Sequence, residues 1–97
     1  MNYRYEFIYN EGNLDKLKSA GFEDVPGFRD YYYTKVEVVG NKLDIHTIYI
    51  NKQTRLLTYR LNDKDYEYFN LFEINEMIAR KINNLVDTKV IVPTNRK

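Results

Sequence analysis

The segment YYYTKVEVVGNKLDIHTIYI, residues 31–50, predicts the centre of the fold. Its two halves, 31–39 and 43–50, are rich in aromatic and β-branched residues, which are typical of β-strands. Between them, the dipeptide Gly40-Asn41 favours a tight hairpin turn. The segment therefore predicts an antiparallel hairpin, and alternation places Tyr32, Val36 and Val38 on one face of its first strand.

The second half of this hairpin changes its apolar phase. Leu43 and Ile45 are in one register of the alternation, whereas Ile48 and Ile50 are in the other. An extra residue in a strand reverses which face the following side chains take. We therefore expect a β-bulge near residues 46–47, which would bring both apolar pairs to the same side.

Three more strands are predicted outside the hairpin. Residues 3–9 alternate aromatic and polar side chains, and residues 55–61 place Leu57, Tyr59 and Leu61 on one face after a turn at 51–54. The β-branched run 88–92 predicts an edge strand, because the proline that follows cannot donate a ladder hydrogen bond.

Two helices complete the predicted fold. Residues 14–20 form a short helix that Asn13 caps and Gly21 closes. A longer helix follows a capping box at Asn70 and Glu73. Its apolar stripe at helical spacing consists of Leu71, Ile74, Ile78, Ile82 and Leu85.

The predicted fold class is therefore α+β. The element order is β-α-β-β-β-α-β, with an antiparallel sheet of three to five strands, a short N-terminal helix and a longer amphipathic C-terminal helix. Residues 1–93 are expected to form one domain, and residues 94–97 a frayed tail.

Composition argues against an enzyme. The chain has 97 residues, no cysteine and one histidine. His46 lacks a second His or Cys as partner, and we interpret it as a half-exposed strand residue. Ser19 lacks the glycines of a nucleophile elbow, and the four glycines form no phosphate-binding loop. We expect no catalytic centre, no metal and no cofactor. No apolar run is long enough for a signal peptide or membrane span, so we expect a cytoplasmic protein.

Charge is distributed unevenly although the net charge is only +1. Residues 31–62 carry five basic and two acidic side chains (+3), residues 63–79 one basic and five acidic (−4), and residues 80–97 five basic and one acidic (+4). Part of the acidic run matches the dipole of the following helix. A solvated surface is the plainer interpretation of the remaining acidic residues, and a partner-binding surface is the alternative.

Ten tyrosines in a chain without tryptophan are the second unusual feature. Each buried tyrosine hydroxyl requires a hydrogen-bond partner, so not all ten fit a core. Tyr66 and Tyr68 lie inside the acidic run. Exposed aromatic side chains beside charges are typical of binding surfaces, both for proteins and for single-stranded nucleic acids.

Several segments together resemble small orphan accessory proteins of phages and mobile elements in low-GC Gram-positive bacteria. They are Leu14-x-x-Leu17 followed by Gly21-Phe22, Tyr31-Tyr32-Tyr33-Thr34-Lys35, Ile48-Tyr49-Ile50-Asn51, Thr54-Arg55 and the helix 72–86. This resemblance implies an accessory gene, and anti-CRISPR inhibition is one activity found among such genes. Inhibitors of that kind bind a host nuclease complex, some with an acidic surface.

The leading hypothesis is therefore a protein that binds and inhibits a host protein, such as a CRISPR-Cas or other defence nuclease. The predicted contact residues are the acidic run and its tyrosines: Asp63, Asp65, Tyr66, Glu67, Tyr68, Glu73 and Glu76. The alternative is a nucleic-acid-binding protein that uses the basic sheet residues Lys35, Lys52, Arg55 and Arg60. A self-associating structural domain is a third interpretation, and the sequence leaves the oligomeric state open.

Overall fold

The computed structural model describes residues 1–96 and confirms the predicted α+β class. The elements follow in the order β1 (Tyr3–Phe7), α1 (Glu11–Ser19), β2 (Asp30–Val39), β3 (Lys42–Asn51), β4 (Leu57–Leu61), β5 (Lys64–Tyr66), α2 (Glu76–Asp87) and β6 (Ile91–Arg96). Strand β5 is an addition to the predicted order. Among the described residues, no helix combines the length and the apolarity that crossing a membrane requires.

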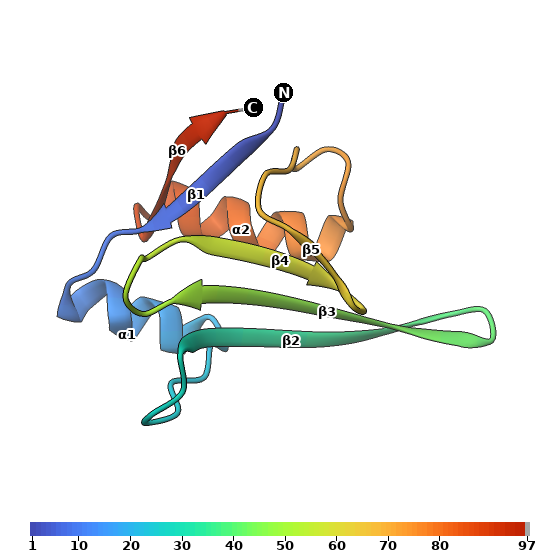
Figure 1. Ribbon diagram of the computed structural model, residues 1–97, viewed down its shortest axis with the longest axis horizontal. Helices are drawn as coiled ribbons and strands as arrows, with labels where there is room; N and C mark the ends of the chain where they lie inside the picture. The colour runs from blue at the N-terminus through green and yellow to red at the C-terminus, as the bar shows by residue number, and fades with distance from the viewer. Residues whose placement is uncertain (97) are drawn as a thin grey trace.

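Strands β2 to β5 form a four-stranded antiparallel sheet in sequence order, and β1 pairs with β6 in a two-stranded sheet. The two sheets meet at β1, where Glu6 bridges to Leu56 and the amide of Phe7 donates to the carbonyl of Arg55 at 2.8 Å. Both helices lie on one side of this layer, and the other face of the sheet is left uncovered (Figure 1). We call the uncovered side the open face.

The core lies between the helices and the sheet. Its buried members include Leu17 of α1, the α2 side chains Ile78, Ile82 and Leu85, and the sheet residues Tyr5, Phe7, Ile48, Ile50, Leu57 and Tyr59. These positions match the aromatic face predicted for the first strand and the inward face predicted for residues 57–61. Burial of such apolar side chains is the main favourable contribution to folding.

The β2–β3 hairpin is regular, so the predicted β-bulge is absent. Residues pair without a shift from Asp30 with Asn51 to Val39 with Lys42. The change of apolar phase therefore has a different cause. Ile48 and Ile50 face the helices and are buried, whereas Leu43 and Ile45 lie on the open face and are exposed.

Helix α2 begins later than predicted. Its N-cap is Asn75, whose side-chain oxygen accepts from the amides of Met77 (3.0 Å) and Ile78 (3.2 Å). Asn70 and Glu73 do contact each other, but within a turn that precedes the helix. The predicted capping box is therefore wrong: Asn75 caps α2 through its side-chain oxygen alone, because Ile78 stands where a capping box requires Glu or Gln.

Helix α1 begins earlier than predicted, with Asn10 as its N-cap accepting from the amide of Asn13 at 2.7 Å. Asn13 is instead buried and donates to the carbonyl of Ile8 at 2.7 Å. The predicted end of the helix at Gly21 is confirmed. The φ angle of Gly21 is +98°, and an added Cβ would lie 3.2 Å from the ring of Tyr33. Only glycine fits there without strain.

Strand β6 continues past Pro93, where we expected the last strand to stop. Pro93 pairs with Tyr5 next to a register shift, which is a position where a missing ladder donor is tolerated. Of the predicted tail, residues 94–96 belong to β6, and Lys97 lies outside the described residues.

Candidate functional site

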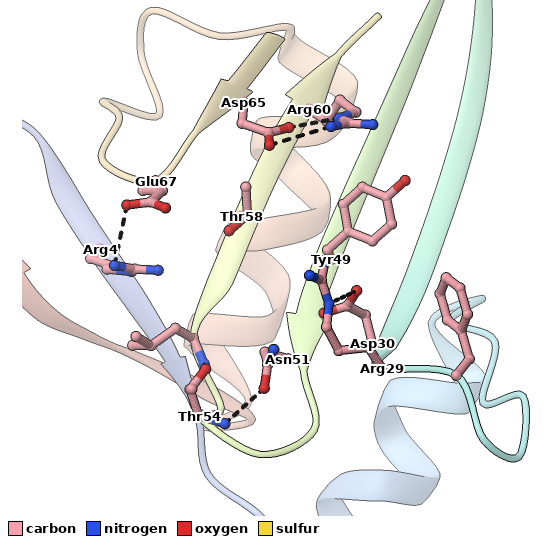
Figure 2. A pocket seen from close by; sticks show the side chains of 12 residues that line it. Arg4, Arg29, Asp30, Tyr49, Asn51, Thr54, Thr58, Arg60, Asp65 and Glu67 are labelled. Atoms are coloured by element: carbon pink, nitrogen blue, oxygen red, sulfur yellow. Dashed lines mark hydrogen bonds and ion pairs between the residues drawn. The ribbon is translucent and has the colours of Figure 1, made fainter. Parts of the chain in front are cut away.

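A polar groove of about 380 Å³ crosses the open face of the sheet (Figure 2). Its walls come from β1, β3, β4, β5 and the start of β2. Successive side chains of a strand point to opposite faces, so alternate residues of these strands reach the groove. The charged wall residues are three arginines and three acids: Arg4, Arg29, Arg60, Asp30, Asp65 and Glu67.

These six charges neutralise one another in pairs. Arg60 donates to Asp65 through Nε at 2.7 Å and Nη2 at 3.4 Å, and this hydrogen bonding raises the pKa of Arg60. Arg4 lies 3.4 Å from Glu67. Arg29 donates to the buried carboxylate of Asp30 at 3.0 Å. The groove is therefore polar without carrying a large charge of either sign.

A tyrosine of the groove, Tyr49, contacts an arginine of the groove and lies beside a second tyrosine of the open face. Tyr32 and Tyr49 are cross-strand neighbours on the open face. Phe28 packs edge-on against Tyr32 at a centroid distance of 5.3 Å, and the Arg60 guanidinium lies 5.9 Å from the centre of the Tyr49 ring. Both residue types are enriched at the centres of protein–protein interfaces.

The distal part of the β2–β3 hairpin, residues 36–45, extends beyond the helices at one end of the molecule (Figure 1). We call it the arm. Val36 pairs with Ile45, and Val38 pairs with Leu43. Their exposed fractions are 50%, 45%, 71% and 59% in that order. Since they alternate in phase with Tyr32, the four side chains lie on the open face and continue from the groove.

The structure divides the predicted acidic contact residues between two faces. Asp65 and Glu67 reach the groove, where they are paired with arginines. Tyr66 lies on the helix side and stacks on Tyr59 at 5.8 Å. Asp63 is exposed at the turn between β4 and β5, and the ring of Tyr68 contacts Arg4 at 5.8 Å.

The two remaining acids of the prediction also have partners. Glu73 accepts from the Asn70 side chain at 3.3 Å, and Glu76 pairs with Arg80 at 2.6 Å on the exposed side of α2. The set proposed from the sequence therefore does not form one continuous acidic surface. Its role in partner binding stays a prediction.

The basic residues of the alternative hypothesis do not gather either. Lys52 pairs with Asp24 at 2.8 Å and donates to the carbonyl of Val25 at 2.9 Å. The Arg55 guanidinium stacks on Tyr9 at 4.6 Å. Arg60 is held by Asp65, and Lys35 points to the side opposite Arg60, because it pairs with His46 on the helix side.

His46 is buried, with 2% of its surface exposed, and this corrects the prediction of a half-exposed strand residue. Its ring stacks parallel to Tyr59, and Nδ1 lies 2.7 Å from the Tyr59 hydroxyl. Burial raises the pKa of Tyr59 to about 12, with smaller contributions from Tyr66, Asp44 and Glu37. The single histidine thus belongs to an organised polar cluster beneath the sheet.

Two groups of residues were missed by sequence reasoning. The arm side chains were missed because a bulge was assumed. The partners of His46 were missed because only His and Cys were considered as its companions. When Gly40 and Asn41 form a two-residue turn, the numbers of any two residues that pair across the hairpin add up to 81. The predicted turn is therefore enough to place Glu37 opposite Asp44.

Comparison of the chain with protein-family models, curated proteins and solved structures found no match.

Proposed function

We propose that this protein is a binding protein that docks a folded protein partner on its open face, with the arm as the principal contact. The observation that carries this proposal is the exposure of the four apolar arm side chains on one face of a regular hairpin. Scattered exposed apolar residues are ordinary, but a contiguous group on a projecting element is typical of an interaction site.

The groove supplies the second part of the interface. A specific protein–protein interface buries about 800 Å² on each partner, which is more than four side chains present. The groove continues the same face and is lined by Tyr49 and three arginines, with Tyr32 paired to Tyr49 across the strands. An apolar arm beside a polar, tyrosine-bearing groove has the mixed composition of a non-obligate interface.

The charges favour a protein partner over a nucleic acid. Nucleic-acid binding depends on cations that neutralise phosphates. On the open face, Arg4, Arg29 and Arg60 each contact an acid. An apolar arm also has no complement on a phosphate backbone. The resemblance to phage accessory proteins supports, as the partner, a host protein such as a defence nuclease, which binding would inhibit.

The test combines affinity capture with matched variants. The tagged protein is used to capture partners from nuclease-treated lysate of a low-GC Gram-positive host. The arm variant, Val38→Ser with Leu43→Ser, is compared with a control, Val25→Ser with Phe72→Ser. The control removes two apolar side chains that are 43% and 97% exposed and lie outside the arm. Circular dichroism verifies that both variants fold.

We expect one stoichiometric protein that the wild-type chain and the control capture and that the arm variant loses. Equal capture by the arm variant would contradict the proposal. If partners captured from untreated lysate are all absent from the nuclease-treated lysate, the nucleic-acid alternative is favoured instead. Sedimentation at two concentrations detects self-association, and an arm-dependent dimer without a second protein would replace the hetero-partner proposal.

The acidic-run hypothesis is tested separately with Asp63→Lys. Reversing Asp65 or Glu67 would also free Arg60 or Arg4 in the groove, so those variants do not isolate the effect of acidity. A loss of capture with Asp63→Lys, together with retained capture by the arm variant, would transfer the contact to the acidic run.

A further inference from the structure

A second pocket lies on the helix side of the hairpin, beneath the base of the arm. Glu37 and Asp44 are paired across β2 and β3, and His46 follows two residues later on the same face. One ligand atom from each of the three side chains lies within 4.8 Å of the others. The cluster lines a pocket of about 280 Å³ that Glu73 and Tyr66 also border.

The orientation of His46 is fixed, and one of its nitrogens is left without a hydrogen bond. Nδ1 contacts the Tyr59 hydroxyl at 2.7 Å. The side chain is only 3% exposed, yet Nε2 has no hydrogen-bond partner in the part of the chain that the structure describes. It points into the cluster, 3.4 Å from Oε1 of Glu37. A buried polar atom without a hydrogen-bond partner is destabilising, so a missing ligand would explain it.

The negative charges of the Glu37 and Asp44 carboxylates are also only partly compensated by their neighbours. Like charges directly opposite each other on paired strands are destabilising. Asn75 donates to both oxygens of Glu37, at 3.1 and 3.2 Å, and Asn62 donates to Asp44 at 3.2 Å. These neutral amides orient the carboxylates without cancelling their charge. Among the described side chains, those of residues 1–94, neither carboxylate forms an ion pair with a lysine or arginine.

We propose that Glu37, Asp44 and His46 form a binding site for a divalent transition-metal ion of the zinc class. An imidazole nitrogen with carboxylate oxygens is a ligand set that Zn²⁺ accepts. Around a tetrahedral Zn²⁺, bonds of about 2.0–2.2 Å place neighbouring ligand atoms about 3.3–3.6 Å apart. The Nε2 to Oε1 distance of 3.4 Å already has this value.

The surrounding contacts match those of a metal site. Ligating histidines bond through their other nitrogen to a polar group, and ligating carboxylates are themselves hydrogen-bonded. Tyr59 has the first role, and Asn62 and Asn75 have the second. Since Asn75 is also the N-cap of α2, a bound ion would connect the base of the arm to the helix.

The test is titration of the full chain with Zn²⁺ by calorimetry, in parallel with Mg²⁺ and Ca²⁺. We expect one Zn²⁺ per chain and at least tenfold weaker binding of the other two ions. Glu37→Gln, Asp44→Asn and His46→Gln should each weaken Zn²⁺ binding at least about tenfold, because outer-shell changes alone cost about 10–100-fold. Tyr59→Phe tests that outer shell. Asp87→Asn, which removes an exposed acid of α2, is the control and should bind as the wild type does.

A readout without substitution protects the test from misfolded variants. The chain has one histidine, so nitrogen NMR of its ring reports on this site alone. Zn²⁺ should shift Nε2 and leave Nδ1 in its tyrosine contact. Absence of Zn²⁺ binding at millimolar concentration, an unshifted Nε2, or undiminished affinity in Glu37→Gln and Asp44→Asn would each overturn the proposal. Equal affinity for Ca²⁺ would mean an oxygen-only site elsewhere and would overturn it too.

Discussion

Two isoleucines of β3 provide the sharpest test of the hairpin register. Ile48 is completely buried, whereas Ile45 is 45% exposed three residues earlier. Truncating a buried isoleucine to alanine removes its transfer free energy and leaves a cavity, at a cost of about 2–5 kcal/mol. Fully burying an isoleucine contributes about 1.5–3 kcal/mol, so a half-exposed one without a cavity should cost about 1 kcal/mol. We therefore expect Ile48→Ala to destabilise the domain at least about twice as much as Ile45→Ala.

Urea unfolding followed by circular dichroism measures this difference. With a slope of about 1.5 kcal/mol per molar urea, a loss of about 3 kcal/mol lowers the midpoint by about 2 M. Ile45→Ala should lower it by less than about 0.7 M on the same slope. Equal, large shifts for both variants would refute the regular register. They would mean that Ile45 reaches the core, as the bulge inferred from the sequence would require.

Two further predictions concern the helix cap and the buried tyrosine. Asn75→Ala should destabilise the domain by about 1–2 kcal/mol, because it removes the N-cap of α2. Asn70→Ala should cost less than half of that, as measured by urea unfolding. A larger loss of stability in Asn70→Ala than in Asn75→Ala would place the helix start at Asn70. Burial raises the pKa of Tyr59 to about 12 from an ordinary value of 10.0, so the folded state favours the neutral hydroxyl. The stability that this preference contributes is complete below pH 10 and is lost as pH rises toward 12. In a tyrosinate absorbance titration the last phase should disappear in Tyr59→Phe, and a single phase near pH 10 for all tyrosines would contradict this.

The sequence was sufficient for the fold because local signals and burial agree in most elements. The strand 57–61 alternates as predicted, and the apolar stripe of α2 supplies the buried residues Ile78, Ile82 and Leu85. The errors lie at element ends, in the register of β3 and in the short strand β5, which was not predicted. The helix starts were predicted at Asn13 and Asn70, whereas the capping side chains are Asn10 and Asn75, and the capping contacts that identify them exist only in three dimensions.

The error in β3 had a different origin. The prediction assumed that every apolar residue of a strand faces the core, and a bulge was the only way to satisfy that assumption. The hairpin is longer than the layer of helices that covers it (Figure 1). In the part of the hairpin that extends past the helices, no core determines which face the apolar residues must take, so they can lie on the open face. A phase change within a strand is therefore also the pattern of a strand that leaves the body of a domain.

The candidate sites depend on contacts that the linear sequence does not order. Asp65 and Glu67 are two residues apart in a run of acids, yet each contacts an arginine from another strand. How much these two acids contribute to the surface potential depends on which arginines they pair with. That pairing can be known only once the order of the strands in the sheet is known. Tyr66 lies between them in sequence and on the opposite face in space, because alternation along β5 separates neighbours.

The same alternation makes the two proposed sites on the hairpin separable by mutation. Val38 and Leu43 face the open side, whereas Glu37 and Asp44 face the helices, although each pair adjoins the other in sequence. Substitutions on one face leave the other face intact. A bound ion would nevertheless connect them physically, since it would join the base of both arm strands to Asn75 at the start of α2. An arm held in place before binding loses less conformational freedom on docking, and this preorganisation raises affinity without adding a contact.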